Sequence, residues 1–407
     1  MSEIPRGWSQ KPLGEIADTQ LGKMLNKAKQ NDSRKVPYLR TDNVHWGRID
    51  LKLVKEMEIT SDERDKFIAQ PGDLLICEGG ASGRTAIWNH DYEIGIQNHL
   101  HRVRTRGEVS NKYLMYYMEW LVKNGLVNHL IKGVTISHLS QSSLRSIGIC
   151  YPGINQQNDI VQILEEHLSR LDAALVDVSQ AKIRSTQFRR SLLKSTFEKF
   201  SSDSVRIGDV VSFNKKKPLE FKTSKLEVSF VPMPKVSEVS GKIILNEKIS
   251  HSEGQRRSLT YFENGDVIFA KITPCMENGK IALADNLFNG AAYGSTEFHV
   301  LTSTKRILPD YLRYFIGSDD FRANAERAMT GAVGQRRVPK IYLEEHPIPL
   351  PSLSVQANVV AYLDVNLSRT DEAVKVAERV ELESIRLRRS LLQSAFSGQL
   401  IKEVSSV

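Results

Sequence analysis

Several polar side chains in the first quarter of the sequence are of the types that hydrogen-bond to the edges of DNA bases. Positions 38–43 read Tyr-Leu-Arg-Thr-Asp-Asn, and arginine and asparagine are the usual readers of guanine and adenine. Positions 79–83 form a glycine-rich stretch, where the backbone can approach a phosphate closely. The contacts predicted in and beside these segments are Arg40, Thr41, Asn43, Ser82, Arg84 and Thr85.

Two polar turns stand at matching places in the two halves of the sequence. Positions 132–138 read Lys-Gly-Val-Thr-Ile-Ser-His, and they align with the more basic Gly-Ala-Val-Gly-Gln-Arg-Arg at 331–337. Specific reading needs base-directed side chains supported by cations on phosphates, so these turns are the best contact candidates. The predicted contacts in them are Lys132, Thr135, Ser137, His138, Gln335, Arg336 and Arg337. Weaker candidates elsewhere in the second half are Lys235, Lys271 and Thr273.

Three arginines alternate along a short stretch of the first half. Arg102, Arg104 and Arg106 would share one face of a β-strand. This row suits a DNA-facing surface, and it suits the solvated side of an edge strand equally well.

Patterns typical of catalysis are missing from the sequence. The stretch Gly-Gly-Ala-Ser-Gly-Arg-Thr has arginine where a phosphate-binding loop needs lysine. Neither a Gly-x-Gly-x-x-Gly cofactor motif nor the Asn-Pro-Pro-aromatic motif of amino-methyltransferases occurs. His99 and His101 have no carboxylate or further histidine at metal-binding spacing, which favours strand residues or DNA contacts over ligands. We therefore predict no catalytic residue, no metal site and no cofactor on this chain.

Length and composition indicate a multidomain protein. The 407 residues exceed one ordinary core, and the net charge of +8 permits phosphate contacts without requiring them. No apolar run approaches the ~20 residues of a membrane helix, and the N-terminal residues lack the apolar segment of a secretory signal. The separated cysteines Cys77, Cys150 and Cys275 predict reduced thiols packed in cores. These features favour a cytoplasmic protein.

The sequence contains a long internal repeat. Positions 152–200 match positions 351–399 without a gap, and roughly 17 of the 49 residues are identical by direct comparison. Upstream, the similarity is loose: Val36-Pro37 aligns with Val231-Pro232, which sets Arg40 opposite Lys235, and Gly72-Asp73 aligns with Gly265-Asp266. The order is therefore variable, constant, variable, constant, which suits two different ligand-binding domains on matched supports.

The constant segments have the apolar spacing of long amphipathic helices. In the first copy the stripe comprises Ile160, Leu164, Leu168, Leu171, Leu175 and Val178, and it resumes at Phe188, Leu192 and Phe197. In the second copy it comprises Val360, Leu363, Leu367 and Val374, and Ser397-Gly398 is a predicted helix stop. Burial of each stripe in its own domain would explain one such helix. Two copies favour an antiparallel coiled coil that acts as a spacer.

The variable segments have shorter, mixed patterns. Turn signals precede strands at 72–73 and 264–266, a short strand is predicted at 85–88, and amphipathic helices at 110–122 and 309–316. The prediction is an α+β fold with a pseudo-two-fold internal repeat: two mixed α/β domains at 1–151 and 201–350, and helical spacers at 152–200 and 351–407.

The arrangement and several motifs resemble a known family. Ile348-Pro349-Leu350-Pro351 leads to Gln356, and positions 388–400 read Arg-Arg-Ser-Leu-Leu-Gln-Ser-Ala-Phe-Ser-Gly-Gln-Leu. Gly7-Trp8 with Leu-Gly-Glu-Ile-Ala at 13–17 looks like the start of one recognition domain, and positions 205–211 like the start of another. Over essentially its whole length the sequence resembles specificity (S) subunits of type I restriction-modification systems. The second domain departs in its first loop, where Glu238 is aligned opposite Asn43.

The resemblance implies a fold and a role. Each target-recognition domain would read half of a bipartite, asymmetric DNA site, and the helices would set the gap and bind two modification subunits. Those subunits carry S-adenosylmethionine and methylate adenine, while restriction (motor-nuclease) subunits use ATP and Mg²⁺. The S subunit holds no cofactor, and such systems are cytoplasmic in bacteria and archaea.

Two other functions are alternatives to the S-subunit role. A self-contained restriction enzyme would need nuclease and methyltransferase motifs, which the sequence lacks. A coiled-coil scaffold whose variable domains bind protein partners is the remaining alternative, and selective retention of particular DNA sequences would distinguish the S-subunit role from it.

Overall fold

The computed structural model describes residues 4–25, 35–131, 138–217, 219–238, 241–332 and 334–400. The chain forms two compact units, and each combines one α/β domain with part of both long helices. The first unit comprises the described residues of Met1–Asp177 and Val380–Val407, and the second comprises those of Val178–Arg379. The units divide the chain differently from the four predicted segments, because each long helix contributes to both. Within the described ranges, no helix is long and apolar enough to cross a membrane.

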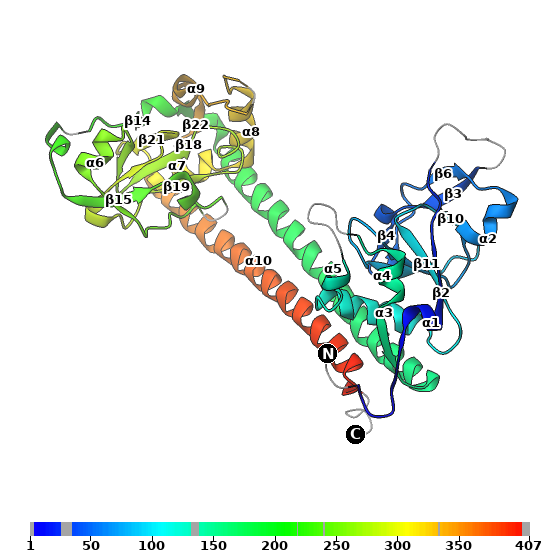
Figure 1. Cartoon of the computed structure of the whole chain (residues 1–407). Coiled ribbons are helices and arrows are strands. Elements are labelled where there is room, and N and C mark those ends of the chain that lie inside the picture. The colour runs from blue at the N-terminus through cyan, green and yellow to red at the C-terminus, as the bar shows by residue number, and fades with distance from the viewer. Residues whose placement is uncertain are drawn as a thin grey trace. The chain divides into compact units, whose positions relative to one another are not determined.

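The first domain consists of short strands and helices that precede the first long helix (Figure 1). Its strands are β1 (Ser9–Pro12), β2 (Ala17–Leu21), β3 (Lys35–Leu39), β4 (Val44–His45), β5 (Arg48–Ile49), β6 (Lys55–Glu58), β7 (Ile68–Ala69), β8 (Leu74–Cys77), β9 (Thr85–Ile87), β10 (Ile94–Ile96), β11 (Leu100–Thr105) and β12 (Gly148–Tyr151). Its helices are α1 (Leu13–Ile16), the 3-10 turn η2 (Thr41–Asn43), α2 (Arg64–Phe67), α3 (Asn111–Lys123) and α4 (Gln141–Arg145).

The second domain repeats this plan. Its strands are β13 (Ser204–Arg206), β14 (Val211–Phe213), β15 (Glu227–Val231), β16 (Lys248–Ser250), β17 (Thr260–Glu263), β18 (Asp266–Ala270), β19 (Ile281–Leu283), β20 (Ala291–Gly294), β21 (Phe298–Ser303) and β22 (Pro347–Pro349). Its helices are the 3-10 turn η8 (Met233–Lys235), α6 (His251–Arg256), α7 (Pro309–Ile316), α8 (Asp319–Arg327) and α9 (Lys340–Glu345).

Three sheets of each domain correspond strand for strand, and the first domain also contains the two-stranded sheet β4-β5. The antiparallel sheet β2-β11-β8-β9 matches β14-β21-β18-β19, and the mixed sheet β6-β3-β10-β7 matches β16-β15-β20-β17. In both mixed sheets the two middle strands are parallel, β3 with β10 and β15 with β20. The pair β1-β12 matches β13-β22. The predicted pseudo-two-fold repeat therefore extends through the domains whose sequences have diverged.

The long helices are α5 (Ile154–Glu198) and α10 (Leu353–Phe396). In the first unit, Leu164 and Leu168 near the start of α5 share a core with Leu392 and Phe396 at the end of α10. In that unit Arg388 of α10 also donates to a carboxylate of α5. The start of α5 therefore packs against the end of α10.

The second unit contains the reciprocal pairing. Leu193 and Phe197 from the end of α5 share a core with Leu363 and Leu367 from the start of α10. Taken together, the two pairings make the helices antiparallel, as predicted. Gly398 has φ +75, the left-handed conformation that ends a helix, and this confirms the predicted stop.

One residue of the predicted apolar stripe is wrong. The side chain of Phe188 in α5 is 48% exposed, because the buried face of the helix resumes only near Leu192. The predicted strand and helices of the domains are confirmed within a residue or two by β9, α3 and α7.

The upstream alignment of the repeat is also wrong, by three residues. The turn η2 follows β3 as η8 follows β15, so Leu39 matches Val231 and Asn43 matches Lys235 instead of Glu238. The Val-Pro pair misled the alignment because it lies within β3 in the first domain, whereas in the second it consists of the last residue of β15 and the N-cap residue of η8. The alignment of Gly72-Asp73 with Gly265-Asp266 is supported, since each aspartate accepts a hydrogen bond from the backbone amide three residues earlier.

Candidate nucleic-acid interface

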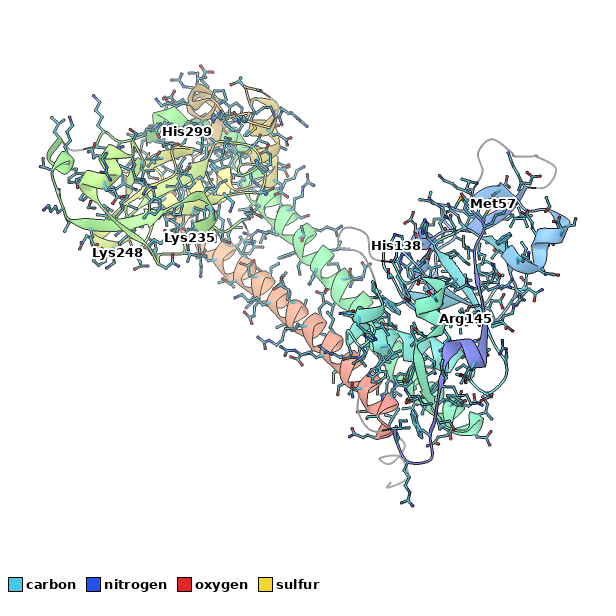
Figure 2. The ribbon with its side chains drawn as sticks, viewed as in Figure 1. Met57, His138, Arg145, Lys235, Lys248 and His299 are labelled. Atoms are coloured by element: carbon cyan, nitrogen blue, oxygen red, sulfur yellow. The ribbon has the colours of Figure 1, made fainter. Side chains whose placement is uncertain are left out.

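Three predicted contact segments of the first domain lie together. A guanidinium nitrogen (Nη2) of Arg84 donates to the carbonyl oxygen of Thr41 at 2.6 Å, which joins the glycine-rich loop to the loop after β3. Gly79, in the same glycine-rich stretch, forms an isolated β-bridge with His138, which is labelled in Figure 2. Residues far apart in sequence therefore form one surface. Lys132, Thr135 and Ser137 lie outside the described residues.

Burial removes two residues from the predicted contacts. Asn43 is 3% exposed, and its side-chain amide accepts from the Arg40 backbone and donates to the Asp50 carbonyl, at 2.9 Å each. Thr85 is fully buried, and its hydroxyl donates to the Gly83 carbonyl at 2.7 Å. Both side chains fix the shape of their loops, which corrects their assignment as DNA contacts.

Other first-domain candidates are partly committed within the protein. Ser82 is 8% exposed and donates to the Glu78 carbonyl. Arg40 is half-buried, and its guanidinium lies 3.4 Å from the Asp42 carboxylate. Beside the glycine-rich loop there is a surface hollow of about 450 Å³, lined by Trp46, Gly80, Ala81, Ser82, Val122, Lys123, Asn128 and Ile131.

The second domain gathers five predicted residues on adjoining loops. The backbone amide of Thr273 donates to the Arg336 carbonyl at 3.0 Å, and the amide that follows Arg337 donates to the Lys271 carbonyl at 2.8 Å. These bonds bring Lys271 and Thr273 beside Gln335, Arg336 and Arg337. Lys235 belongs to a different loop, after β15, where its ammonium lies 3.2 Å from Glu247.

The second-domain cations are paired with carboxylates. Arg337 forms a two-pronged ion pair with Glu297, with N···O distances of 2.9 and 2.8 Å. This guanidinium lowers the pKa of the Glu297 carboxyl. Arg336 lies 3.6 Å from Glu326 and 4.0 Å from Glu277. A phosphate that binds either arginine would therefore compete with an internal carboxylate.

Backbone hydrogen bonds make the two interfaces directly comparable. The amide of Glu78 donates to the His99 carbonyl at 2.8 Å, and the amide of Lys271 donates to the Glu297 carbonyl at 2.9 Å. The carbonyls of Glu78 and Lys271 each accept from the residue after the predicted turn, at 2.7 and 2.8 Å. His138 forms a β-bridge with Gly79 and Arg337 with Ile272, residues that lie two positions after β8 and β18 respectively, which supports their alignment.

A buried histidine lies behind each interface. His101 is fully buried and His299 is 6% exposed, and each ring contacts a backbone carbonyl through Nε2, at 2.9 and 3.0 Å. These carbonyls belong to Leu139 and Val338, the residues that directly follow the aligned turns. Because a carbonyl only accepts, Nε2 carries the proton in both rings. The prediction of His101 as a strand residue is confirmed.

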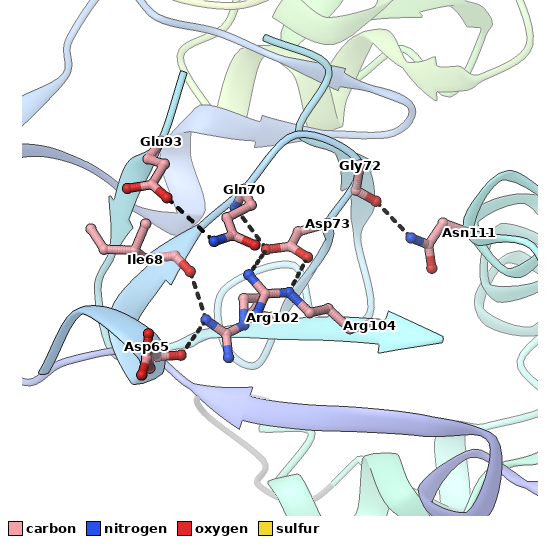
Figure 3. A network of polar contacts seen from close by, with 9 residues as sticks. All are labelled: Asp65, Ile68, Gln70, Gly72, Asp73, Glu93, Arg102, Arg104 and Asn111. Atoms are coloured by element: carbon pink, nitrogen blue, oxygen red, sulfur yellow. Dashed lines mark hydrogen bonds and ion pairs between the residues drawn. The ribbon is translucent and has the colours of Figure 1, made fainter. Parts of the chain in front are cut away.

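The alternating arginines stabilise the first domain from within (Figure 3). Arg102 is 8% exposed and donates to the carbonyls of Asp65 and Ile68, at 2.9 and 2.6 Å. Arg104 holds Asp73 with two bonds, at 2.6 and 2.8 Å. Their strand, β11, lies between β2 and β8, so it is not an edge strand. Arg102 and Arg104 thus link the two sheets and the turn before β8, whereas Arg106, just after β11, is exposed and forms an ion pair with Asp18 at 2.5 Å.

Sequence reasoning missed one group of side chains. Glu78, His99 and His138 offer ligand atoms that lie within 4.8 Å of one another. No local motif could reveal them, because they come from three separate segments. The one signal in the sequence was the alignment of His138 with Arg337, which indicates that both residues lie next to the sheet of their domain.

The comparison with known proteins identifies the family. The family model described as the type I restriction modification DNA specificity domain matches residues 5–177 and again 201–384. The chain belongs to this family. The two matches fall on the two halves of the structural repeat, so each half is a DNA specificity domain of the family.

Curated relatives include type I specificity subunits of Escherichia coli. The EcoAI specificity subunit is 35% identical over 170 residues, which cover 41% of this chain and 28% of the relative. The EcoKI specificity subunit of strain K12 is 20% identical over an alignment that covers 98% of this chain and 90% of the relative. The matched part is therefore less than a third of EcoAI but most of EcoKI.

Solved structures share the fold of this specificity-family chain. One, from a study of complex assembly and conformational transition of the type I restriction-modification system, matches with a TM-score of 0.73 and 17% identity, covering 98% of this chain and 100% of its own. The HsdS subunit of Thermoanaerobacter tengcongensis matches with a TM-score of 0.56 and 18% identity, covering 98% of each chain.

Proposed function

We propose that this chain is the DNA-sequence-reading subunit of a type I restriction-modification assembly. The observation that carries the proposal is that two specificity domains share one backbone plan but present different side chains at equivalent loop positions. At the three equivalent positions compared above, the first domain has Glu, His and His, and the second has Lys, Glu and Arg. Domains that share a scaffold but differ at their loops suit two unlike half-sites.

The long helices have a surface suited to protein partners. Eight large apolar side chains of α10 are exposed, among them Tyr362, Val365, Ile385 and Leu387 at 52–58%. On α5, Ile183 and Phe188 are 47% and 48% exposed. A gathering of exposed apolar side chains is typical of a surface that binds a protein partner, unlike isolated ones. We assign this surface to two modification subunits, with restriction subunits joining the same assembly.

Catalysis belongs to the partners in this account. S-adenosylmethionine, ATP and Mg²⁺ would bind to the modification and restriction subunits, and this chain would supply sequence recognition alone. The expected place of action is the cytoplasm, where the DNA of a bacterium or archaeon lies.

Methylome sequencing tests the proposal in cells that express the whole system. Methylated adenines should fall in two unlike half-sites separated by a constant number of unspecified base pairs. Inserting four residues into α5 adds about 6 Å of helix, and the gap should widen by about one or two base pairs. Methylation without a sequence motif would contradict the proposal, and an unchanged gap would contradict the spacer role.

A further inference from the structure

The cluster of Glu78, His99 and His138 lies at the junction of three backbone segments of the first domain. Glu78 directly follows β8, His99 directly precedes β11, and His138 ends the first aligned turn. The amide of Glu78 donates to the His99 carbonyl, and the Glu78 carbonyl accepts from the residue after His138. Backbone hydrogen bonds therefore fix all three attachment points before any side chain is considered.

The side chains converge from these points. The Nδ1 atom of His99 lies 3.3 Å from a carboxylate oxygen of Glu78, and the two imidazole centroids are 5.7 Å apart. Gly79 lies beside both rings, since a Cβ built there would be at ordinary contact distance, 3.4 Å from Nδ1 of His138 and 3.7 Å from Nδ1 of His99. His99 has φ +75, an uncommon conformation for a residue with a side chain. The local backbone thus aims His99 into the cluster at some conformational cost.

The donor set suits a transition-metal ion. Two imidazole nitrogens and one carboxylate oxygen are the ligands of many three-residue Zn²⁺ sites, whereas Mg²⁺ and Ca²⁺ prefer oxygen alone. Ligands at about 2.0 Å from a tetrahedral Zn²⁺ lie roughly 3.3 Å from one another. The three donor atoms, all within 4.8 Å of one another and one pair at 3.3 Å, need only small side-chain adjustments.

The second domain shows what these positions do without metal-ligand side chains. Its equivalents are Lys271, Glu297 and Arg337, and there the Arg337 guanidinium forms the two-pronged ion pair with Glu297. That ion pair ties the aligned turn to the start of β21. In the first domain, the imidazole of His138 cannot form such a two-pronged ion pair. A comparable side-chain link between His138 and the residue before β11 therefore needs a bridging ion.

We propose that Glu78, His99 and His138 form a Zn²⁺ site that ties the backbone at His138 to the sheet, in place of the second domain's Arg337–Glu297 ion pair. Three protein ligands leave a fourth coordination position open to water. The site belongs to the first domain alone, and its Zn²⁺ binding can be measured without DNA, independently of the proposed function.

The test is Zn²⁺ titration of the full-length, tag-free chain against a chromogenic chelator. One Zn²⁺ per chain should bind to the native protein. His99→Ala and His138→Ala should each weaken this binding at least tenfold, while His129→Ala, an exposed histidine of the same domain outside the cluster, should leave it unchanged. Co²⁺ at the same site should give visible absorption bands typical of tetrahedral coordination, and both cluster variants should lose them.

A folding control comes from neutral side chains of similar size. The double variant Glu78→Gln/His138→Gln removes two ligands and keeps His99, because another side chain would be strained at its φ of +75. This variant should keep the unfolding midpoint of the metal-free native chain and lose Zn²⁺ binding. No Zn²⁺ equivalent on the native chain would overturn the proposal. Equal Zn²⁺ affinity of the native chain and the double variant would also overturn it.

Discussion

In the first domain, the loop positions that follow β8 and precede β11 carry glutamate and histidine. In the second, the same backbone positions carry lysine and glutamate, although the hydrogen bonds around them agree within about 0.1 Å. The side chains behind these loops differ far less, since in each domain a buried histidine contacts the equivalent backbone carbonyl. The repeat thus keeps its internal anchors and varies its loops, as expected of two readers with different targets.

The helix ends differ in a second way. Arg388 of α10 contacts Glu119, which is 2% exposed, and Asp172, whereas its repeat equivalent Arg189 forms an ion pair with Asp371, which is 31% exposed. Arg388 holds the pKa of Glu119 below its usual range despite the opposing effect of burial. The constant segments are alike in sequence, but the arginine of the first unit pairs with a buried carboxylate and that of the second with a partly exposed one.

Replacing that arginine should produce the largest difference between the units. Arg388→Ala leaves the buried Glu119 carboxylate with the ion pair to Lys123, which should lower the free energy of unfolding of the first unit by roughly 3 kcal/mol. Arg189→Ala should lower that of the second by less than about 1 kcal/mol, because its ion pair is partly exposed. Trp8, Trp46, Trp88 and Trp120 all belong to the first unit, so tryptophan fluorescence during denaturation reports that unit alone. Equal losses of unfolding free energy in the two units, measured by hydrogen exchange, would contradict this difference between Arg388 and Arg189.

Two glutamines should instead behave alike. Gln157 and Gln356 are fully buried, and each donates to two backbone carbonyls and accepts from one amide. Alanine at either position leaves two backbone carbonyls and one amide without their hydrogen-bond partner, so each unit should lose about 2 kcal/mol of unfolding free energy. Amide hydrogen exchange resolved by unit measures both losses. A difference above about 1 kcal/mol would break the equivalence of the anchors.

The paired histidines predict a shared pH response. Burial lowers the pKa of His101 and His299, so the folded protein binds fewer protons than the unfolded chain. Their contribution to stability is present above the unfolded pKa of about 6.5 and is lost as pH falls below it. Between pH 7.5 and 5.5, the double variant His101→Gln/His299→Gln should lose less stability than the native chain, because glutamine donates without titrating. Identical pH slopes in thermal denaturation would count against this account.

The smallest effects are expected at the second-domain turn. In the assembled complex, Arg336→Ala/Arg337→Ala should weaken DNA binding and reduce the salt dependence by about one unit of slope per lost phosphate contact. Glu326→Gln frees Arg336 from a competing carboxylate and should strengthen binding by no more than a few-fold. Filter binding across a salt series checks both. Unchanged affinity in the double-alanine variant would remove this turn from the interface.

The sequence was a good guide to whatever periodicity or repetition could reveal. The helices α5 and α10, the turns at Gly72 and Gly265, and the stop at Gly398 all follow from local chemistry. The alignment of the first loops failed because a short Val-Pro match outweighed strand position. Asn43 and Thr85 looked like DNA readers because residue type says nothing about burial, which tertiary packing decides.

The most direct test of two unlike readers is selection of DNA by the assembled complex from a random-sequence pool. Sequencing of the retained DNA should give two different short motifs at one fixed separation. Arg336→Ala/Arg337→Ala should relax only one of them. Two identical motifs, a single continuous motif or no enrichment would contradict the account.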